Sequence, residues 1–569
     1  MRLSKVVIDH YRSIGHVEIR MPENKPLVLF GANNAGKSNI ISAIQRALGE
    51  RWPLTQELED SDFFMRDKSS YPNATITCKF DSTYFVDRYG NLYDHFVLHY
   101  AADASQSQFT DLNGSKLYIN NDARSVIQSF VVDADRDIGR ELSYYSRYSL
   151  LSKFSHAVHQ SLSEDDRISL EASFEEIKKT FEGVPEYATF FSKFKDVLEE
   201  SVKGFVHSLK ADFSAYDPNN FAKSIRIYAY EGNDVRAFEE FGTGEQQVLL
   251  MAFAKAYVET FGAKALVLII EEPEAHLHPL AQRWLKEYVY EVCNEGLQVI
   301  LSTHSADFLD MSNLDGMVRV TKSSEGITSA RQVSPGELAR HCHELGAPAD
   351  KVTAENVSRF YGSKLFPDEA KGFFASKVLI VEGATEYFAL PELFSKLGHS
   401  LVREGVEIVN VRGKTSIPLY WRLFSAFGIE CCCIFDGDIK KEGGKAANDA
   451  LGTILGIDVS AILDGMVGDG EMYVCRDAAF FSKDFERFMR AESASYLTYE
   501  KQWRDEYGVT SKPELARATS RALQVEDIPK EFETIWEKVI TFSVELRQSE
   551  SDDAQLENGD SIEDFEIPF

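Results

Sequence analysis

The sequence predicts an α/β protein with two separate α/β domains, a helical insert in the first domain and a disordered acidic tail. Three observations predict this arrangement. An apolar strand runs into a glycine-rich turn at residues 26–38, a second apolar strand lies at residues 265–270, and a new series of strands and helices begins after about residue 365. Apolar strands that alternate with helical patterns are typical of parallel sheets covered by helices, so both domains are expected to be of the α/β class.

Composition limits the function without assigning it. The chain has 569 residues and a net charge of −29, which argues against coating nucleic acid through bulk positive charge but leaves a local basic groove or metal-binding carboxylates open. No run of about 18 apolar residues occurs, so we expect no membrane span. The start lacks a long apolar signal region and the seven cysteines form no CxxC pair, so we expect a cytoplasmic protein with reduced thiols.

The segment PLVLFGANNAGKS at residues 26–38 is a strand, a glycine-rich loop and the start of a helix, which is the full context of a phosphate-binding loop. Glycines let backbone N–H groups point at phosphate oxygens, and the helix N-terminus adds positive partial charge. Lys37 is expected to reach the β and γ phosphates and Ser38 to ligate Mg²⁺. The ATP-binding residues expected here are Gly31, Asn34, Gly36, Lys37, Ser38 and Asn39.

The second half of an ATPase site is expected far along the chain, where ALVLII at residues 265–270 reads as a buried parallel strand. It ends in Glu271, placed to hold the Mg²⁺ shell, and Glu272, placed to orient the attacking water. Upstream, Gly242, Thr243, Gly244 and Glu245 open an apolar helix that would cap the γ-phosphate bound by a second subunit. Downstream, a strand ends at His304, which would sense that phosphate.

These four pieces resemble the ABC-type ATPase heads of the RecF/SMC group. GANNAGKS resembles their Walker A motif, FGTGEQQ the signature, LVLIIEEPEAHLHP the Walker B motif with its D-loop, and STHS the switch histidine. The resemblance implies two heads that enclose two ATP molecules, hence a homodimer. Glu271 stands where most of these proteins have Asp, and no Q-loop glutamine is assigned, although Asp62, Phe63 and Phe64 lie in the expected region.

About 200 residues separate Ser38 from Gly242, too few for the long coiled coil of SMC proteins. The charged stretch at residues 151–215 has apolar positions near i, i+3 or i+4 and i+7, which predicts a helical hairpin. Two interpretations remain open: a packed helical lid, or a dimerisation arm.

A second acidic centre is predicted after residue 365. SKVLIVEGATE ends a strand at Glu382, with Glu386 four residues on, and a later strand ends in Asp436-Gly437-Asp438. Residues i and i+2 on a strand share a face, so these carboxylates would repel one another unless cations lay between them. Hard oxygen ligands suit Mg²⁺ or Mn²⁺.

The order of a glutamate strand followed by DxD on a small βαβ sheet resembles a TOPRIM domain. An ABC head followed by TOPRIM resembles the OLD (overcoming lysogenization defect) nucleases, a family that includes the GajA subunit of Gabija anti-phage systems. This resemblance makes Glu382, Glu386, Asp436 and Asp438 metal ligands. It adds Asp484 and Glu486 as candidate ligands and Lys512 as a candidate transition-state stabiliser, although a solvated lysine before proline fits Lys512 equally well.

Two divalent ions about 3.5–4 Å apart would hold the scissile phosphate, one activating a water and the other stabilising the leaving oxygen. With the ion bound beside ATP, three ions are expected. The expected function is therefore an ATP-regulated DNA endonuclease or nickase in phage defence. The alternatives are a non-catalytic, RecF-like DNA clamp or repair mediator, and a toxin-type effector that cleaves RNA such as tRNA.

The tail from Glu550 onward carries eight carboxylates and no Lys or Arg, which predicts disorder. Its tip, DFEIPF, resembles the acidic C-terminal tip of bacterial single-stranded DNA-binding protein. We therefore expect Ile567, Pro568 and Phe569 to dock on host repair proteins that read that tip, with an unselected solubilising tail as the alternative. An adjacent UvrD-like helicase gene would mark a Gabija subunit rather than a stand-alone OLD protein.

The expected domain boundaries follow from these segments. They are residues 1–150 for the first part of the ATPase head, 151–215 for the insert, 216–365 for the second part of the head, 366–545 for the TOPRIM domain and 546–569 for the tail.

Overall fold

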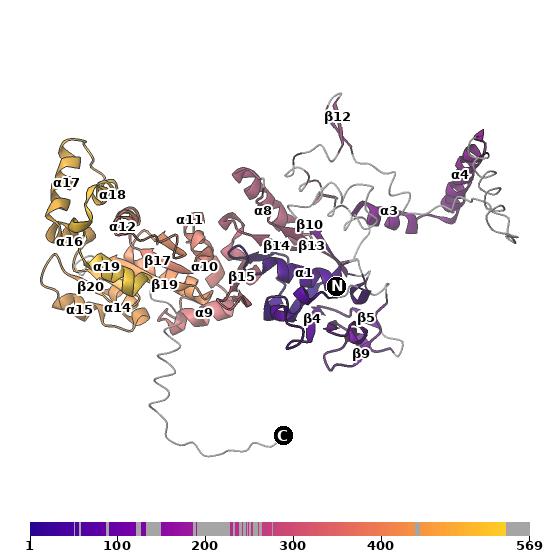
Figure 1. Cartoon of the computed structure of the whole chain (residues 1–569), viewed down its shortest axis with the longest axis horizontal. Coiled ribbons are helices and arrows are strands. Elements are labelled where there is room, and N and C mark those ends of the chain that lie inside the picture. Colours follow the sequence, from indigo (N-terminus) through magenta and orange to yellow (C-terminus); the bar gives the residue numbers. More distant parts are fainter. Residues whose placement is uncertain are drawn as a thin grey trace, which may run out of the picture. The chain divides into compact units, whose positions relative to one another are not determined.

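The structure is a computed structural model of the full chain (Figure 1). It describes residues 1–49, 52–55, 58–86, 90–120, 124, 127–132, 150–185, 189, 228–231, 234–237, 242, 246, 249, 252–253, 256, 260, 265–275, 277–437 and 444–541. Asp438, the signature residues Thr243, Gly244 and Glu245, and the expected tail lie outside the described residues.

The chain forms two compact units. The first contains Met1–His16, Glu23–Pro26 and Ser38–Thr303, and the second contains Val17–Pro22, Leu27–Lys37 and His304–Phe569. The strand and loop of the predicted nucleotide site, residues 27–37, therefore belong to the same unit as the TOPRIM segment.

The first unit contains an antiparallel group of strands in the order β1-β4-β7-β8-β9. Their apolar side chains alternate between buried and less buried positions, as expected for a sheet with one face on a core. The bounds are β1 Leu3–Tyr11, β4 Asn73–Phe80, β7 His95–Ala101, β8 Gln108–Thr110 and β9 Lys116–Leu117. β2 Ile14–Arg20 follows β1 and belongs to the second unit from Val17 onward, and β5 Phe85–Val86 pairs with β6 Leu92–Tyr93.

A second group in the first unit is parallel, with the order β10-β13-β14. Its bounds are β10 Ile127–Val132, β13 Ala265–Glu271 and β14 Gln298–Thr303. In register, Ile270 lies opposite Val132 on one side and Leu301 on the other. The apolar run that predicted a buried parallel strand is thus β13, and its carboxylates lie at its end.

The helices of the first unit connect these strands. Helix α1 Lys37–Leu48, whose first residue belongs to the second unit, buries Ile40, Ile41 and Ile44, and α8 Pro279–Asn294 contacts β14. The other elements are η1 Pro53–Thr55, η2 Asp60–Asp62, η3 Phe64–Arg66, η4 Ala104–Gln106, α3 Leu150–Gln160, α4 Glu164–Glu182 and the hairpin of β11 Tyr228–Glu231 with β12 Asp234–Ala237.

The described part of the predicted insert is helical. Within it, α4 is exposed along nearly its whole length, and its apolar residues Ile168 and Ile177 are 58% and 50% exposed. The packed lid and the dimerisation arm both stay predictions for this insert. The rest of the predicted hairpin, residues 190–215, lies outside the described residues.

In the second unit, β3 Leu27–Phe30 pairs in parallel with β15 Met317–Lys322, which pairs in antiparallel with β16 Thr328–Gln332. Short helices follow: η7 Ala306–Phe308, η8 Met311–Gly316, α9 Pro335–Glu344, α10 Val357–Gly362, α11 Pro367–Ala370 and η9 Lys371–Phe374. All four residues of β3 are buried, which matches the continuous apolar run in the sequence.

The remainder of the second unit contains a five-stranded sheet in the order β18-β17-β19-β21-β20, parallel except for β20. The bounds are β17 Lys377–Val381, β18 Val406–Asn410, β19 Glu430–Asp436, β20 Met472–Val474 and β21 Ala478–Phe481. Cys431, Cys432 and Cys433 lie buried in β19, and burial raises the pKa of Cys432 to about 12. The predicted α/β class is confirmed for both units.

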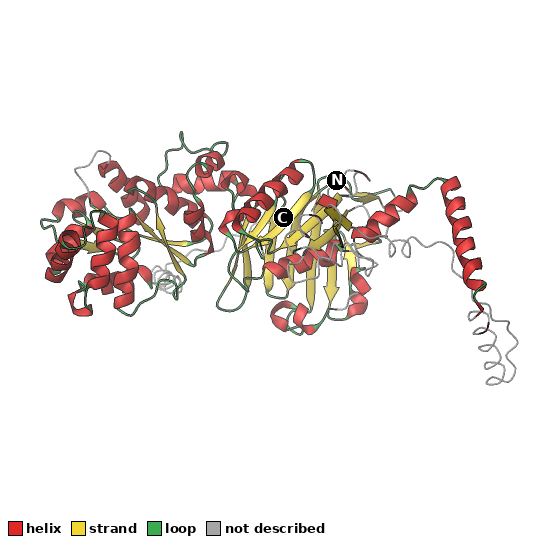
Figure 2. Cartoon of the chain, turned by 90° about the horizontal axis from the view of Figure 1, so that it is seen from above, coloured by secondary structure: helices red, strands yellow, loops and turns green. Residues whose placement is uncertain are grey.

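Helices surround this sheet (Figures 1 and 2). They are α12 Ala384–Lys396, η10 Lys414–Ser416, α13 Ile417–Ala426, α14 Gly444–Leu455, α15 Val459–Gly465, α16 Phe485–Glu492, α17 Ala494–Asp505, α18 Lys512–Ala522, η11 Val525–Asp527, α19 Glu531–Ile535 and η12 Trp536–Ile540. Leu379, Ile434 and Phe481 of the strands pack with Leu393 and Phe532 of the helices in one core. No single described helix is long and apolar enough to cross a membrane, and the bent pair α14–α15 passes that test only when taken together.

Candidate functional site

The predicted phosphate-binding loop has the backbone that its glycines require. Gly31 has φ +149° and Gly36 has φ +109°, both in a region that side chains rarely adopt. A Cβ atom on Gly31 would lie 2.1 Å from the Val320 carbonyl oxygen, and one on Gly36 would lie 2.1 Å from the Thr328 hydroxyl. Asn34 also has a positive φ, of 63°. The loop therefore packs so closely against β15 and β16 that a side chain at either glycine would collide with them.

Lys37 lies at the centre of this loop. Its side chain is only 5% exposed, and its ammonium donates hydrogen bonds to the carbonyl oxygens of Gly31 (3.0 Å) and Ala32 (3.1 Å). The imidazole Nε2 of His304 lies 2.9 Å from the same ammonium. The structure thus brings the predicted switch histidine to the predicted phosphate-binding lysine, although 267 positions separate them in sequence.

In the first unit, the predicted carboxylates follow β13. Glu271 is its last residue, opposite Ser302 of β14. Glu272 has φ +47°, and its main-chain N–H donates to the Ser302 carbonyl oxygen at 2.9 Å. Two residues on, the Glu274 carboxylate accepts a hydrogen bond from the Thr303 hydroxyl at 2.9 Å. The end of β13 is therefore tied to the end of β14, immediately before His304.

The start of α1 is joined to the β1–β2 turn. The Asn39 amide donates to the Ser13 hydroxyl at 2.7 Å. Asp62 is buried and binds Arg12 (2.9 Å) and Arg46 (2.8 Å), an ion-pair network that the sequence did not reveal. Of the signature residues expected to contact ATP, the structure describes Gly242 alone.

The two acidic strand ends of the second unit meet as predicted. β17 and β19 are parallel neighbours, with Val381 opposite Ile434, so Glu382 and Asp436 follow at one edge of the sheet. The main-chain N–H of Asp436 donates to the Glu382 carboxylate at 3.3 Å. The Asp436 carboxylate accepts a hydrogen bond from the Phe485 N–H at 3.1 Å, at the start of α16.

Glu386 lies in the first turn of α12, directly after this strand end. It is 3% exposed, and its carboxylate accepts a hydrogen bond from the Gly383 N–H at 3.1 Å. Burial, with the negative charges of Glu382 and Glu486, raises the pKa of Glu386 to about 7. Glu486 is joined to the same turn through the Thr385 hydroxyl, at 3.4 Å. Oxygen donors that repel one another in this way fit a divalent cation, which would favour the ionised form.

The other two candidates, Asp484 and Lys512, make different contacts. The Asp484 carboxylate caps α16 by accepting from the Arg487 N–H at 2.8 Å and pairs with the Arg487 guanidinium at 3.3 Å. Lys512 is exposed in the first turn of α18, and no hydrogen bond or ion pair in the described part of the chain joins it to the acidic residues. Within the described residues, no group of three or more His, Cys, Asp or Glu side chains is arranged to hold a metal ion.

Two polar residues at this edge were missed in the sequence. The buried Lys414 ammonium donates to the carbonyl oxygens of Asp436 (2.5 Å) and Gly437 (2.9 Å). The Asn448 amide donates to the Gly437 carbonyl oxygen at 3.4 Å. The only signal for Lys414 was a Gly-Lys pair just after a predicted strand, which more often reads as a solvated turn.

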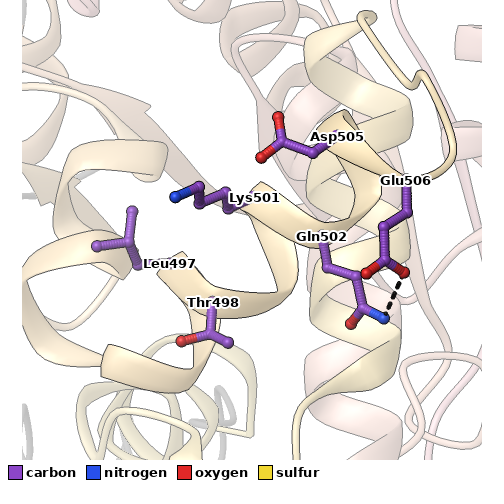
Figure 3. Close-up of a pocket in the computed structure, with 6 residues that line it drawn as sticks. All are labelled: Leu497, Thr498, Lys501, Gln502, Asp505 and Glu506. Carbon is purple, nitrogen blue, oxygen red and sulfur yellow. Dashed lines mark hydrogen bonds between the residues drawn. The ribbon is translucent and has the colours of Figure 1, made fainter.

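A hollow of about 420 Å³ lies elsewhere, on α17 (Figure 3). Its lining residues are Leu497, Thr498, Lys501, Gln502, Asp505 and Glu506, and Gln502 donates to Glu506 at 3.0 Å. Because none of the predicted site residues lines it, this hollow is not assigned to the chemistry of either centre.

Two known families match the two segments that contain these residues. The family described as "AAA ATPase domain" matches residues 1–188 and 110–309, more than half of the chain. The family described as "Overcoming lysogenization defect protein-like, TOPRIM domain" matches residues 373–438, which include Glu382, Glu386 and Asp436. The OLD nuclease of Thermus scotoductus is 25% identical over 458 residues, which cover 77% of this chain and 82% of that relative. The chain belongs to the OLD family of ATPase–TOPRIM nucleases.

Other relatives match smaller parts of this OLD-family chain. The Old nuclease of Escherichia phage P2 is 28% identical over 242 residues, which cover 41% of this chain and 39% of the phage protein. An Smc head domain from Pyrococcus furiosus, solved with an extended coiled coil and bound to a ScpA domain, is 17% identical, covers 61% of this chain and all of its own, and has a TM-score of 0.37. An SMC head domain from Thermotoga maritima gives a TM-score of 0.30 at 14% identity, covering 58% of this chain and 99% of its own.

Proposed function

We propose that this OLD-family nuclease is a divalent-metal-dependent DNA endonuclease that nicks duplex DNA, with ATP controlling assembly or access to DNA. The observation that supports it best is the meeting of Glu382 and Asp436 at the ends of adjacent parallel strands, with the buried Glu386 beside them. A cluster of this kind concentrates negative charge that Mg²⁺ or Mn²⁺ would neutralise.

In this proposal, Glu382, Glu386, Asp436 and Asp438 hold two Mg²⁺ or Mn²⁺ ions, with Glu486 beside Glu386 and Asp484 as a further candidate. Two such ions supply an activated water and stabilise the leaving oxygen of a phosphodiester. Glu382, Asp436 and Asp438 are thereby the catalytic carboxylates. Lys512 stays a candidate transition-state stabiliser, although its exposed position at the start of α18 gives no support to that role.

We assign the ATP site to the phosphate-binding loop and the ends of β13 and β14. Lys37, with Gly31, Asn34, Gly36 and Asn39, binds the phosphates, and Ser38 with Glu271 holds one Mg²⁺ ion. Glu272 orients the water and His304 senses the γ-phosphate. Gly242, Thr243, Gly244 and Glu245 contact the nucleotide of a second subunit, so the active form is a homodimer, and the exposed helix α4 is suited to a dimerisation arm.

The domain boundaries of the sequence analysis are kept as part of this proposal: residues 1–150 and 216–365 for the ATPase head, 151–215 for the insert, 366–545 for TOPRIM and 546–569 for the tail. One refinement is supported by the contacts, since residues 27–37 group with the second unit.

A cleavage assay tests the proposal. The full chain is incubated with supercoiled plasmid and, separately, with tRNA, with Mg²⁺, Mn²⁺ or EDTA, and with or without ATP. Conversion of supercoiled plasmid to open circle that needs the divalent ion supports a DNA nickase. Cleavage of tRNA but not of plasmid would contradict the DNA nickase proposal and indicate an RNA-cleaving effector. ATP-dependent DNA binding without cleavage of either substrate would indicate a RecF-like clamp.

A role in anti-phage defence and its partners are part of the same proposal. The acidic run before Ile567, Pro568 and Phe569 resembles a tip read by host repair proteins, so these residues would guide the nuclease to DNA intermediates. Deleting the three residues should remove binding to such a repair protein, and unchanged binding would contradict this role. A UvrD-like helicase encoded next to this chain would make it a Gabija subunit.

A further inference from the structure

Lys414 lies at the end of the acidic strand β19, where its ammonium binds main-chain carbonyl groups. It begins η10, just after β18, and its side chain is 6% exposed. Its ammonium donates to the carbonyl oxygens of Asp436 and Gly437 and lies 4.9 Å from the centre of the Phe435 ring. A buried ammonium is costly unless such partners replace its water.

The same turn also contacts the first acidic strand. The main-chain N–H of Gly413 donates to the Glu382 carbonyl oxygen at 2.7 Å. Residues 413 and 414 therefore bind the main chain at both strand ends, one hydrogen bond to Glu382 and two to Asp436 and Gly437. This turn therefore binds both carboxylate-bearing residues through their main chain.

The opposite side of Gly437 is closed by β21. Its N–H donates to the Lys483 carbonyl oxygen at 3.0 Å. A Cβ atom on Gly437 would lie 2.5 Å from the Ser482 carbonyl oxygen and 2.6 Å from that of Phe481. The main chain at Gly437 is thus closely packed against the end of β21 and the residues after it. On its other side, Lys414 binds the carbonyl oxygens of Asp436 and Gly437, and Asn448 binds that of Gly437.

We propose that Lys414 is a positioning residue, whose ammonium holds the Asp436–Gly437 main chain so that the Asp436 carboxylate stays where the divalent cation binds. This rests on the proposed metal-dependent nuclease function. Hydrogen bonds from a charged donor are shorter and stronger than neutral ones, and groups that orient metal ligands typically change metal affinity by about 10- to 100-fold.

The test uses the full chain and measures Mn²⁺ binding by titration calorimetry and plasmid nicking across a range of Mn²⁺ concentrations. Lys414→Met should weaken Mn²⁺ binding by about 10- to 100-fold, and excess Mn²⁺ should restore nicking. Lys414→Arg, which keeps the charge and donors, should recover part of the affinity. Lys364→Met, at an exposed lysine of the same unit, is the matched control and should bind Mn²⁺ as the wild type does.

The outcomes distinguish a failure of the Lys414 proposal from a failure of the proposed nuclease function. A folded Lys414→Met chain that binds Mn²⁺ like the wild type would overturn the role of Lys414. Should that variant not fold, Lys414→Gln, which is neutral but keeps an amide donor, takes its place, and wild-type affinity in Lys414→Gln overturns the role equally. If the wild type itself neither binds Mn²⁺ nor cleaves, the nuclease proposal fails instead.

A separate set of contacts joins the nucleotide loop to the start of the acidic strands. Phe30, the residue before Gly31, packs against Phe373, Phe374 and Phe427, with ring centres 5.7, 5.8 and 6.2 Å away. Arg319 of β15 lies opposite Phe30 in the strand register and is 9% exposed.

The Arg319 guanidinium reaches the same two segments. It donates to the carbonyl oxygens of Gly428 (2.9 Å), Phe427 (3.3 Å) and Ala375 (2.8 Å). Ala375 lies two residues before β17 and Gly428 two residues before β19. Glu382 directly follows β17 and Asp436 ends β19, so each carboxylate is one strand length from a segment that Arg319 binds.

We further propose that Phe30 and Arg319 transmit nucleotide occupancy of the loop to the spacing of Glu382 and Asp436. This also rests on the proposed function. Parallel strands packed in a core move as rigid elements, so a shift of β3 at Gly31 would displace the starts of β17 and β19 together.

The readout is the ratio of nicking rates with and without a non-hydrolysable ATP analogue, at saturating Mn²⁺. Phe30→Leu should bring this ratio about 2- to 30-fold closer to one, with nucleotide affinity and nucleotide-free nicking within about threefold of the wild type. Phe374→Leu should act in the same direction and serves if Phe30→Leu does not fold. Phe360→Leu, on α10, is the control and should keep the wild-type ratio. An unchanged ratio in both anchor variants, or a wild-type ratio of one, would overturn the coupling.

Discussion

Asp436→Asn should abolish metal-dependent cleavage while leaving ATP binding intact. Asparagine keeps a carbonyl oxygen that accepts the Phe485 N–H, and the main-chain bond to Glu382 is unaffected, so the strand end should fold as before. The variant loses only the negative charge that a divalent cation needs. We expect the rate of plasmid nicking to fall on the order of a hundred- to a thousandfold. This is the typical rate loss when an enzyme loses one preorganised electrostatic group.

The measurement is plasmid nicking with Mg²⁺ or Mn²⁺, beside ATP binding by the same preparation. Asp464→Asn is the matched control, because Asp464 is an exposed aspartate at α15 in the same unit. The control should cut at the wild-type rate. Wild-type cutting by Asp436→Asn would show that Asp436 is not part of the nuclease centre.

The acidic strand ends could be predicted from the sequence because each signal is local. An uninterrupted apolar run before Glu382 and another before Asp436 indicate buried parallel strands, and parallel neighbours end at one edge of a sheet. The same reasoning placed Glu271 at the end of β13. The α/β class and the OLD family followed from these motifs and are confirmed.

The contacts that support those motifs could not be predicted, because they join residues far apart in sequence. Lys414 lies 22 residues before Asp436, and Arg319 lies more than 100 residues before Gly428. In sequence both read as ordinary surface cations, since Lys and Arg are seldom buried without partners. Their partners are main-chain carbonyl groups, which every residue carries and which therefore leave no signal in the sequence.

Glu386→Gln should reduce the loss of folding stability that the metal-free protein undergoes as the pH rises. The pKa of Glu386 is raised from 4.5 to about 7, so the folded chain holds a proton that the unfolded chain releases. The stability from this group is fully present below about pH 4.5 and is lost as the pH rises through about 7. At one pKa unit per 1.36 kcal/mol, the loss is on the order of 3 kcal/mol, or about 6–12 °C in Tm for a domain of 150–250 residues.

The comparison is the apparent Tm in EDTA at pH 5 and pH 8. The Tm of the wild type should fall more between pH 5 and pH 8 than the Tm of Glu386→Gln. Glu404→Gln, at an exposed glutamate, should show the same fall in Tm as the wild type. An equal loss in wild type and Glu386→Gln would refute the raised pKa. Adding Mn²⁺ at pH 8 should raise the Tm of wild type more than that of Glu386→Gln, because a cation favours the ionised carboxyl group. Proton and cation then compete for the same buried cluster, so nicking at limiting Mn²⁺ should increase with pH between about 6 and 8, and excess Mn²⁺ should flatten that dependence.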